Sequence, residues 1–386
     1  MTYQPPRSDW MTDEHVMLEE MASKWLPETW GPKTADWRKG AMMDRAAWNQ
    51  AGEAGFLCAS IPEEYGGAGG DFGHEAVLNM VPARLNMAFW ANNNSVHSAI
   101  VAHYILAYGT EEQKRRWLPK MATGELVGAL AMTEPSTGSD VQSIKTRAVK
   151  DGNVYRMTGS KTFISNGQHA DIIVVACKTD PKERAKGVSL MVVETEGAEG
   201  FRRGRNLEKA GLHAADTSEL FFDEVAVPPE NLLGGEEGKG FAHLMSSLPQ
   251  ERLILAAGAV GAMEGAVGLA IDYAKERETF GKPLLGHQTV AHRIAHAKTQ
   301  TTVARSFFDE CLREHMDGKL SNEKAAMAKY WLTDLQCEVI DSMLQVFGGY
   351  GYMMEYPIAE MWQDARVQRI YGGSNEIMKE IVARGL

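Results

Sequence analysis

The chain has 386 residues, of which 44% are hydrophobic and 24% charged, a profile typical of a globular protein with one large domain or several smaller ones. Its formal net charge of −11 disfavours broad attraction to nucleic acid or to an anionic membrane surface, although a local basic groove for a phosphate-bearing ligand stays open. The four cysteines are widely separated and form no CxxC pair, which indicates free thiols rather than a disulfide framework or a zinc site.

We find no apolar run that approaches the roughly 20 residues needed to span a bilayer, so we expect no stable membrane insertion. The first ten residues, MTYQPPRSDW, have neither a hydrophobic signal core nor an arginine-rich presequence. We therefore expect a cytoplasmic protein, with a mature organellar form that has lost its presequence as the open alternative.

Residues 1–125 are expected to form an α-helical N-terminal domain. The apolar run Ser95–Tyr108 predicts a helix that ends at the following glycine, a residue suited to helix C-termini. Thr110, with Gln113 three residues later, has the capping-box pattern and begins a second predicted helix that ends near Gly124.

The glycine-rich stretch at residues 66–70 follows a helical pattern and lacks the spacing of the dinucleotide-binding fingerprint. We interpret it as a surface turn. This argues against a nicotinamide-dependent dehydrogenase.

Residues 126–236 are expected to form a middle β-domain. Short runs rich in β-formers are separated by turn residues without interleaved helices, which favours a compact antiparallel barrel or sandwich over a doubly wound sheet. The predicted strands are Leu126–Met132, Val154–Thr158, Ile172–Lys178, Val188–Val193 and Glu219–Val227.

Residues 237–386 are expected to form a C-terminal helical bundle, because long helical patterns joined by short connections favour antiparallel neighbours. A glycine-rich joint, Gly234 to Gly240, leads into this region. The predicted helices are Phe241–Arg277, Gln288–His315 and Asn322–Phe347.

His292 and His296 have the i, i+4 spacing of metal ligands on a helix. No glutamate stands between them as in HExxH, and no third ligand suggests itself. We interpret them as a solvated helix face and assign no metal.

Four segments spread along the chain resemble the acyl-CoA dehydrogenase family: AMTEPSTGSD at 131–140, RETFGK at 277–282, QVFGGYG at 345–351 and RVQRIYGGSNEI at 366–377. Each segment is weak evidence alone, whereas all four in order over a helical–β–helical chain are specific. The resemblance implies an α-helical N-terminal domain, a central β-domain and a C-terminal four-helix bundle. It also implies a homotetramer built as a dimer of dimers, with FAD bound partly across a subunit interface.

The implied reaction is FAD-dependent α,β-dehydrogenation of an acyl-CoA to the trans-2-enoyl-CoA, with electrons passed to an electron-transfer flavoprotein. An acyl-CoA oxidase or a flavin monooxygenase on the same fold is the alternative that the sequence leaves open. A non-catalytic binding homologue is disfavoured because the motifs expected to bind FAD are complete.

The loop that ends at Ser139 contains small residues, which let backbone N–H groups approach a polar ligand closely. A simple β-turn is the alternative interpretation. By resemblance, this loop and the segment 163–165 contact the flavin, Phe163 covers one face of the ring, and Ser139 also touches the acyl-CoA. The FAD contacts implied here are Leu130, Met132, Thr133, Gly138, Ser139, Phe163, Ile164 and Ser165.

Arg277 ends a predicted helix, where a cation complements the helix dipole. By resemblance, Arg277, Phe280 and Gln288 instead hold the FAD of the neighbouring subunit, a role that suits the bidentate pairing of arginine with phosphate. Phe347 replaces a histidine that many relatives carry, and the two glycines after it are equally compatible with a helix C-cap. The further implied FAD contacts are Gln345, Val346, Gly348, Gly349, Ser374, Asn375 and Glu376.

A proton beside a thioester is weakly acidic, so the reaction needs a positioned carboxylate and donors for the developing enolate oxygen. In many relatives the base is a glutamate in a Tyr-Glu-Gly-Thr segment, which in this chain reads YGGS at 371–374. Long-chain and isovaleryl-type relatives place it at the head of the first bundle helix, and the segment LPQERL at 248–253 supplies Glu251 there. We therefore predict Glu251 as the catalytic base, although Glu251 beside Arg252 would otherwise be interpreted as a surface charge pair.

Pro249 is expected to bend or restart the first bundle helix. Gly372 leaves space where the other base would stand, and by resemblance its N–H donates to the thioester oxygen. The substrate contacts implied by the resemblance are Ser139, Pro249, Gln250, Arg252, Tyr371, Gly372 and Gly373.

The C-terminal third resembles the long-chain branch, which favours long or branched acyl chains. Trp90 and the run Asn92–Asn94 fall where the family lines its acyl tunnel, and they suit a shorter or partly polar tail. A polar loop between helices is the alternative for this run, and the acyl chain length stays open.

Overall fold

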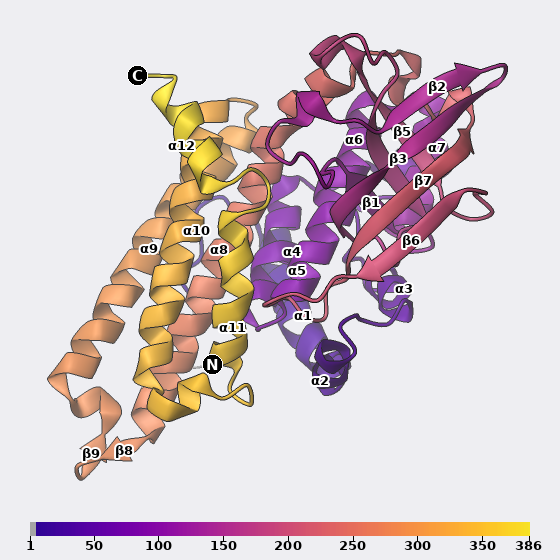
Figure 1. Cartoon of the computed structure of the whole chain (residues 1–386). Coiled ribbons are helices and arrows are strands. Elements are labelled where there is room, and N and C mark those ends of the chain that lie inside the picture. Colours follow the sequence, from indigo (N-terminus) through magenta and orange to yellow (C-terminus); the bar gives the residue numbers. More distant parts are fainter. Residues whose placement is uncertain (1–4) are drawn as a thin grey trace.

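The computed structural model describes residues 5–386 and consists of N-terminal helices, a β-sheet and a C-terminal helical bundle (Figure 1). Helix α4 (Phe72–Arg84) packs against α8 (Gly240–Glu276) of the bundle, and the helical segment η2 (Ser95–Ala102) packs against strand β1 (Gly128–Ala131). The N-terminal helices therefore contact both other parts. This arrangement confirms the expected order of a helical domain, a central β-domain and a helical domain.

The N-terminal helices form largely where the sequence predicts them. The predicted helix over Ser95–Tyr108 is present, but its first half, η2 (Ser95–Ala102), is a π-helix that continues directly from α5. The capping box is also confirmed, since the Thr110 N–H donates to Gln113 Oε1 at 3.0 Å and the Gln113 N–H donates to Thr110 Oγ1 at 3.3 Å. The helices are α1 (Asp13–Thr29), α2 (Gly31–Lys39), α3 (Ala46–Glu53), α4 (Phe72–Arg84), α5 (Ala88–Asn94), η2, α6 (His103–Tyr108) and α7 (Glu111–Ala122).

The middle strands form one continuously paired sheet in the order β1-β4-β2-β3-β7-β6, with β5 on the other side of β4. Pairing is mostly antiparallel as expected, but β4 runs parallel to β1 and meets the end of β2 in parallel register. The strands are β1 (Gly128–Ala131), β2 (Arg147–Asp151), β3 (Val154–Ser165), β4 (Ile172–Lys178), β5 (Val188–Glu194), β6 (Phe201–Asn206) and β7 (Thr217–Val227).

The sequence analysis missed β2 and β6. Strand β2 is mostly exposed and β6 mostly half-buried, and both are rich in charged residues, so neither has the alternating apolar signal of a strand. Backbone pairing to β3 and β7 holds them in the sheet instead.

The long bundle helices begin and end within one residue of the predicted bounds. Pro249 neither restarts nor ends the first of them, since α8 runs as one helix of 37 residues through it. The elements are α8 (Gly240–Glu276), the hairpin β8 (Glu278–Thr279) and β9 (Lys282–Pro283), α9 (Gln288–Met316), α10 (Asn322–Val346), α11 (Pro357–Ala365) and α12 (Asn375–Ala383).

Helix α8 is the helix in the described part of the chain that is long and apolar enough to cross a membrane, with a mean hydropathy of 1.8 over its most apolar 18-residue stretch. The expectation that no stretch reaches this apolar length is therefore wrong. In the fold, 89% of that stretch is buried inside the protein, so α8 is the core helix of the bundle.

Two glycines let α8 approach α4 closely. A Cβ atom on Gly261 would lie 2.2 Å from the carbonyl oxygen of Met80, and one on Gly265 would lie 2.3 Å from that of Arg84. Between these glycines, the buried Glu264 pairs with Arg84 at 2.8 Å and with Arg305 of α9 at 2.7 Å. Close backbone packing and this buried ion network fix the position of α8.

Candidate active site

The Glu251 side chain is buried in α8, where its Oε1 accepts a hydrogen bond of 2.6 Å from the Tyr104 hydroxyl of α6. Burial raises the pKa of Glu251 to about 7, because removal from water disfavours the charged carboxylate. The Tyr104 hydrogen bond and the Arg252 charge act in the opposite direction. A carboxyl group with this pKa can both accept and release a proton near neutral pH.

A buried cavity begins one helical turn from Glu251. Leu255 and Gly258 of α8 line it and lie on the same helix face as Glu251. Apolar, amide, hydroxyl and carboxyl side chains from other helices and loops complete the lining: Asn79, Ala83, Ala88, Ala91, Asn92, Ser95, Leu212, Asp364, Gln368 and Tyr371. The cavity measures only about 10 Å³, room for about one water molecule, and it lies beside the helix face that carries Glu251.

The residues proposed for the acyl tunnel lie in different environments. Asn92 lines the cavity, whereas Asn93 and Asn94 are buried away from it and hydrogen-bond to the surrounding chain, and all three are helical rather than part of a loop. Trp90 does not line the cavity. Its ring packs edge-on against Trp30 and Trp48, with centroids 4.8 and 5.1 Å away.

The loop at residues 371–375 lies against the same part of α8. Gly372 has a φ of +63°, which strains any side chain, and a Cβ there would lie 2.4 Å from Leu255 Cδ1. The space expected at Gly372 is thus occupied by Leu255. The buried Lys329 of α10 anchors the loop, since its ammonium donates to Gly373 O at 2.7 Å and to Asn375 Oδ1 at 2.9 Å.

Lys329 and Arg252 are buried cations near this loop. Burial, together with the neighbouring Arg252 charge, lowers the pKa of Lys329 to about 7. Arg252 donates to Asn322 Oδ1 at 2.5 Å, and its Nε is buried without a hydrogen-bond partner. An unpaired buried donor beside Glu251 is suited to an acceptor atom on a ligand.

The remaining predicted substrate residues lie around the N-terminal part of α8 and the sheet. Pro249 and Gln250 are half-buried, and Gln250 Nε2 donates to Ala99 O of η2 at 2.7 Å. Tyr371 lines the cavity, whereas Ser139 lies on an exposed loop. The fold therefore places Tyr371 near Glu251. Within residues 5–386, no hydrogen bond or ion pair joins Ser139 to the residues around Glu251.

The two segments predicted to contact the flavin are held side by side. The buried Lys161 donates to Met132 O and to Glu134 Oε1, both at 2.9 Å, and the Thr162 N–H donates to Thr133 O at 3.0 Å. Leu130 and Met132 pack against the cluster that contains Tyr104, so these segments border the Glu251 region.

Phe163 is displayed on the surface rather than buried in a core. It has a φ of +59°, stands where the β3–β7 register shifts, and is 67% exposed. Ile164 beside it is buried and Ser165 half-buried. An exposed aromatic held in a strained backbone conformation is suited to stack on a planar ligand.

The turn interpretation of the loop before Ser139 is also correct locally, because Glu134 and Thr137 exchange backbone hydrogen bonds across a tight turn. Gly138 and Ser139 follow that turn on an exposed stretch, and a Cβ on Gly138 would meet little but Thr133 Cγ2 at 3.8 Å. Backbone N–H groups here are open to a ligand.

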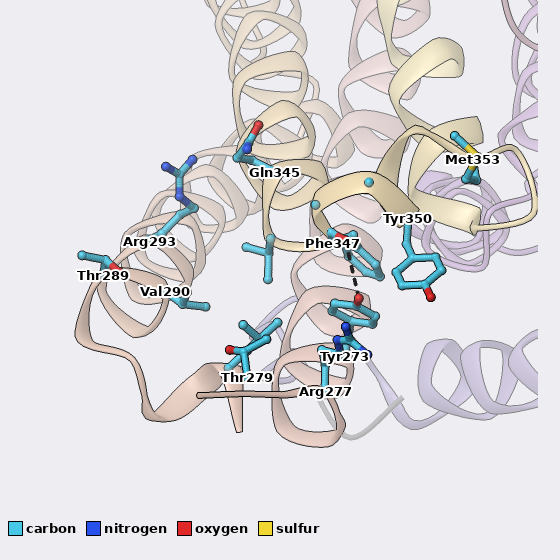
Figure 2. A pocket seen from close by; sticks show the side chains of 14 residues that line it. Tyr273, Arg277, Thr279, Thr289, Val290, Arg293, Gln345, Phe347, Tyr350 and Met353 are labelled. Carbon is cyan, nitrogen blue, oxygen red and sulfur yellow. Dashed lines mark hydrogen bonds between the residues drawn. The ribbon is translucent and has the colours of Figure 1, made fainter. Parts of the chain in front are cut away.

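A second pocket lies at the far end of the bundle, at the C-terminal ends of α8 and α10 (Figure 2). Arg277 stands over the Tyr350 ring at 5.9 Å, and the Tyr273 hydroxyl donates to Phe347 O at 3.5 Å. The structure brings together these predicted residues in the lining: Arg277, Gln345, Val346, Gly348 and Gly349.

Two predicted partners of Arg277 lie outside this lining. Phe280 is 97% exposed with a φ of +52°, and Gln288 is exposed at the start of α9, next to the lining residue Thr289. Arg293 also lines the pocket, so the lining contains two guanidinium groups, those of Arg277 and Arg293.

The Glu251 region and the Arg277 pocket lie far apart. At about 1.5 Å per residue, the stretch of α8 between Glu251 and Arg277 spans roughly 39 Å. A single ligand molecule therefore cannot contact both groups within one copy of the chain.

The residues at the start of α12 differ in role. Asn375 is buried and hydrogen-bonds to Lys329, Thr333 and Asp334 of α10, so it holds α12 in place. Ser374 is half-buried and Glu376 exposed at the N-terminus of the helix.

Neither histidine of the i, i+4 pair is in a candidate metal cluster, and both lie exposed on α9. A cluster of His15, Asp71 and His74 does exist, but each histidine Nδ1 accepts a backbone N–H at a helix N-terminus. We therefore interpret this cluster as helix capping.

Sequence reasoning missed Tyr104 and Lys329 as site residues. Tyr104 and Lys329 each lie in an apolar helical segment. A polar side chain at a position that faces the core could have identified each of them as a candidate site residue. Their partners are distant in sequence, with Glu251 lying 147 residues after Tyr104.

The raised pKa of Glu251 predicts a pH-dependent effect of Glu251→Gln on stability. Between pH 4.5 and about 7 the folded state binds this proton more tightly than the unfolded state, so ionised Glu251 opposes folding at higher pH. The variant should be more stable than wild type at pH 8 by about 2–3 kcal/mol, and the difference should vanish near pH 4. Thermal unfolding at both pH values measures this, and a pH-independent difference would contradict it.

Comparisons with known proteins agree with this geometry. Family models match residues 12–125 (acyl-CoA dehydrogenase, N-terminal domain), 129–225 (middle domain) and 238–386 (C-terminal domain). The chain is 45% identical over 375 residues to the mitochondrial long-chain specific acyl-CoA dehydrogenase of Sus scrofa, covering 97% of this chain and 86% of that protein.

Solved structures are equally similar. An acyl-CoA dehydrogenase from Geobacillus kaustophilus superposes with a TM-score of 0.94 at 47% identity, covering 98% of this chain and 99% of that one. A structure described as the electron transferring flavoprotein of Acidaminococcus fermentans also has a TM-score of 0.94, at 36% identity and with the same coverage. This chain therefore belongs to the acyl-CoA dehydrogenase family and is an oxidoreductase that acts on acyl-CoA.

Proposed function

We propose that this protein carries out FAD-dependent α,β-dehydrogenation of an acyl-CoA to the trans-2-enoyl-CoA, with Glu251 as the base and an electron-transfer flavoprotein as the electron acceptor. The observation that carries the proposal is the buried Glu251 carboxyl, held by Tyr104 one turn from a cavity that Tyr371 also lines. Family membership supplies the reaction class.

The residues of this chain supply the proton chemistry. Glu251 accepts the α-proton of the thioester, and its pKa of about 7 makes it a stronger base than an exposed carboxylate. Tyr104 orients the carboxyl group, and the Gly372 N–H is available to donate to the thioester oxygen as negative charge develops there. Bound FAD supplies the acceptor for the hydride from the β-carbon.

The residues present fit FAD. Phe163 offers an exposed aromatic face beside an open loop, and Arg277 lines a pocket with glycines that leave its floor unobstructed. Because Arg277 lies about 39 Å along α8 from Glu251, near which the segments proposed to contact the flavin lie, we propose that these segments and Arg277 contact different FAD molecules and that each cofactor lies across a subunit interface. Such sharing would join at least two copies of the chain, with the exposed Phe280 reaching towards a partner, and we propose the dimer of dimers that the resemblance implies.

We propose a long or branched acyl chain as substrate. The similarity to the long-chain specific enzyme of Sus scrofa supports this. A panel of acyl-CoAs from short to long and branched, scored by flavin bleaching, should show fastest bleaching with long or branched chains. Preference for short straight chains would contradict the assignment.

Glu251→Gln should keep FAD and acyl-CoA binding but bleach the flavin more slowly by about 10²–10⁴-fold, because the amide cannot accept the α-proton. Glutamine still accepts the Tyr104 hydrogen bond, so the local geometry is preserved. The measurement is anaerobic single-turnover bleaching at saturating acyl-CoA. A near wild-type rate would remove Glu251 as the base.

The same wild-type sample tests the acceptor. After bleaching, slow reoxidation in air and fast reoxidation by electron-transfer flavoprotein are expected. Fast reoxidation in air with peroxide release would instead identify an oxidase.

Arg277→Ala should weaken FAD retention and oligomer assembly together, since loss of a charge-assisted hydrogen bond is worth roughly 1.5–3 kcal/mol. Arg277→Lys is the matched control, because it keeps the charge but loses the planar guanidinium group. Its flavin content and degree of assembly should lie between those of wild type and Arg277→Ala. The flavin content and mass of the particle after dilution measure both effects. Full flavin and unchanged assembly in Arg277→Ala would show that Arg277 does not bind the cofactor.

A further inference from the structure

Glu251 must lose the α-proton that it accepts before the next turnover. This requirement rests on the proposed function. The carboxyl is buried, and its neighbour Arg252 is permanently protonated and cannot take up a proton. With an acyl-CoA bound, the cavity beside Glu251 is filled. The proton therefore needs an exit through the protein on the other side of the carboxyl.

Three hydroxyl groups lead away from Glu251 along the seam between α6 and α8. The Tyr104 hydroxyl donates to Glu251 at 2.6 Å. Ser247 lies one turn before Glu251 on α8, close enough to Tyr104 for its hydroxyl to lower the pKa of Tyr104. Ser247 Oγ shares a hydrogen bond of 3.1 Å with the hydroxyl of Tyr108, which lies one turn after Tyr104 on α6. The i, i+4 spacing on both helices aligns these groups on facing surfaces.

Exposure increases along this chain of hydroxyls. Tyr104 is 1% exposed, whereas Ser247 and Tyr108 are both half-buried and reach the surface. The Tyr108 hydroxyl also donates to His243 O at 3.2 Å, and the His243 ring stacks on Tyr108 with centroids 4.0 Å apart. His243 Nδ1 is buried without a hydrogen-bond partner, so an unpaired polar atom lies beside Tyr108, the last of the three hydroxyl residues.

We propose that Tyr104, Ser247 and Tyr108 form a proton relay that carries the α-proton from Glu251 to solvent while the acyl-CoA still occupies the cavity. Each hydroxyl both donates and accepts, which a relay requires and which a purely structural contact does not. None of the three residues touches the reacting carbon, so they act through Glu251.

The transfer balances as a shift of one proton over each link. Protonated Glu251 donates to the Tyr104 oxygen as the Tyr104 proton passes to Ser247, the Ser247 proton passes to Tyr108, and the Tyr108 proton passes to water. The carboxylate is restored and water gains one proton. Burial and the Glu251 charge hold the pKa of Tyr104 well above its usual value, so Tyr104 must receive a proton as it gives one.

The test measures proton exit separately from oxidation. Holoenzyme and unlabelled acyl-CoA are incubated anaerobically in D2O, and reversal of the dehydrogenation returns the proton held by Glu251 to the α-carbon. If that proton has left, deuterium takes its place. Recovered acyl-CoA is analysed for deuterium at the α-carbon, distinguished from the β-carbon by NMR, and flavin bleaching is recorded in parallel.

Wild type should incorporate deuterium. Ser247→Ala and Tyr108→Phe each remove one link, and each should lower α-deuterium incorporation relative to bleaching by roughly 10²-fold, the lower range of positioned proton-transfer groups. Ser246→Ala is the matched control, because this exposed neighbour on α8 lies outside the chain of hydroxyls. It should match wild type in both measurements.

Wild-type incorporation in both relay variants would overturn the relay and leave the assignment of Glu251 intact. Absence of incorporation in wild type would overturn it as well, because the proton would then stay on Glu251. Equal losses of bleaching and incorporation would mean that the residues act in the oxidation itself, which also contradicts the proposal. A normal bleaching rate in Glu251→Gln would instead refute the proposed function, so the two failures are distinguishable.

Discussion

The close packing of α8 against α4 is the constraint on which the rest of the site depends. Gly261 and Gly265 allow the two backbones to meet, and the pairs that Glu264 makes with Arg84 and Arg305 fix the sliding and rotation of α8. Because α8 carries Glu251 in its first half and ends at Arg277, the same packing sets the positions of the proposed base and of the proposed phosphate pocket. A shift of α8 would move both.

A buried carboxylate in the seam between two helices destabilises the fold, and the surrounding hydrogen bonds offset only part of that effect. Burial has the largest effect on the pKa of Glu251 and raises it, although the Tyr104 hydrogen bond and the adjacent Arg252 charge lower it. Lys329 is in a comparable position, since burial lowers its pKa although it donates to Gly373 O. Two opposite charges thus lie near the 371–375 loop, each with a pKa displaced towards neutrality, as expected where function overrides stability.

The sequence predicted what depends on local pattern. Helical periodicity gave the bounds of α9 and α10 almost to the residue, and the resemblance of residues 248–253 to long-chain relatives led to Glu251 as the proposed base. It failed where non-local contacts decide. Charged residues concealed β2 and β6, and the hydrogen bond between Tyr104 and Glu251 joins segments that are distant in sequence.

The geometry also explains why the base cannot simply be transferred to position 372. A glutamate there would need a left-handed backbone conformation, which strains a residue with a Cβ, and that Cβ would meet Leu255 Cδ1 at 2.4 Å. Leu255 is the far end of a flexible side chain and can move, but it lines the cavity, so its displacement changes the space for the substrate. Moving the base is therefore coupled to the shape of the cavity, because a glutamate at position 372 would displace the Leu255 side chain that lines it.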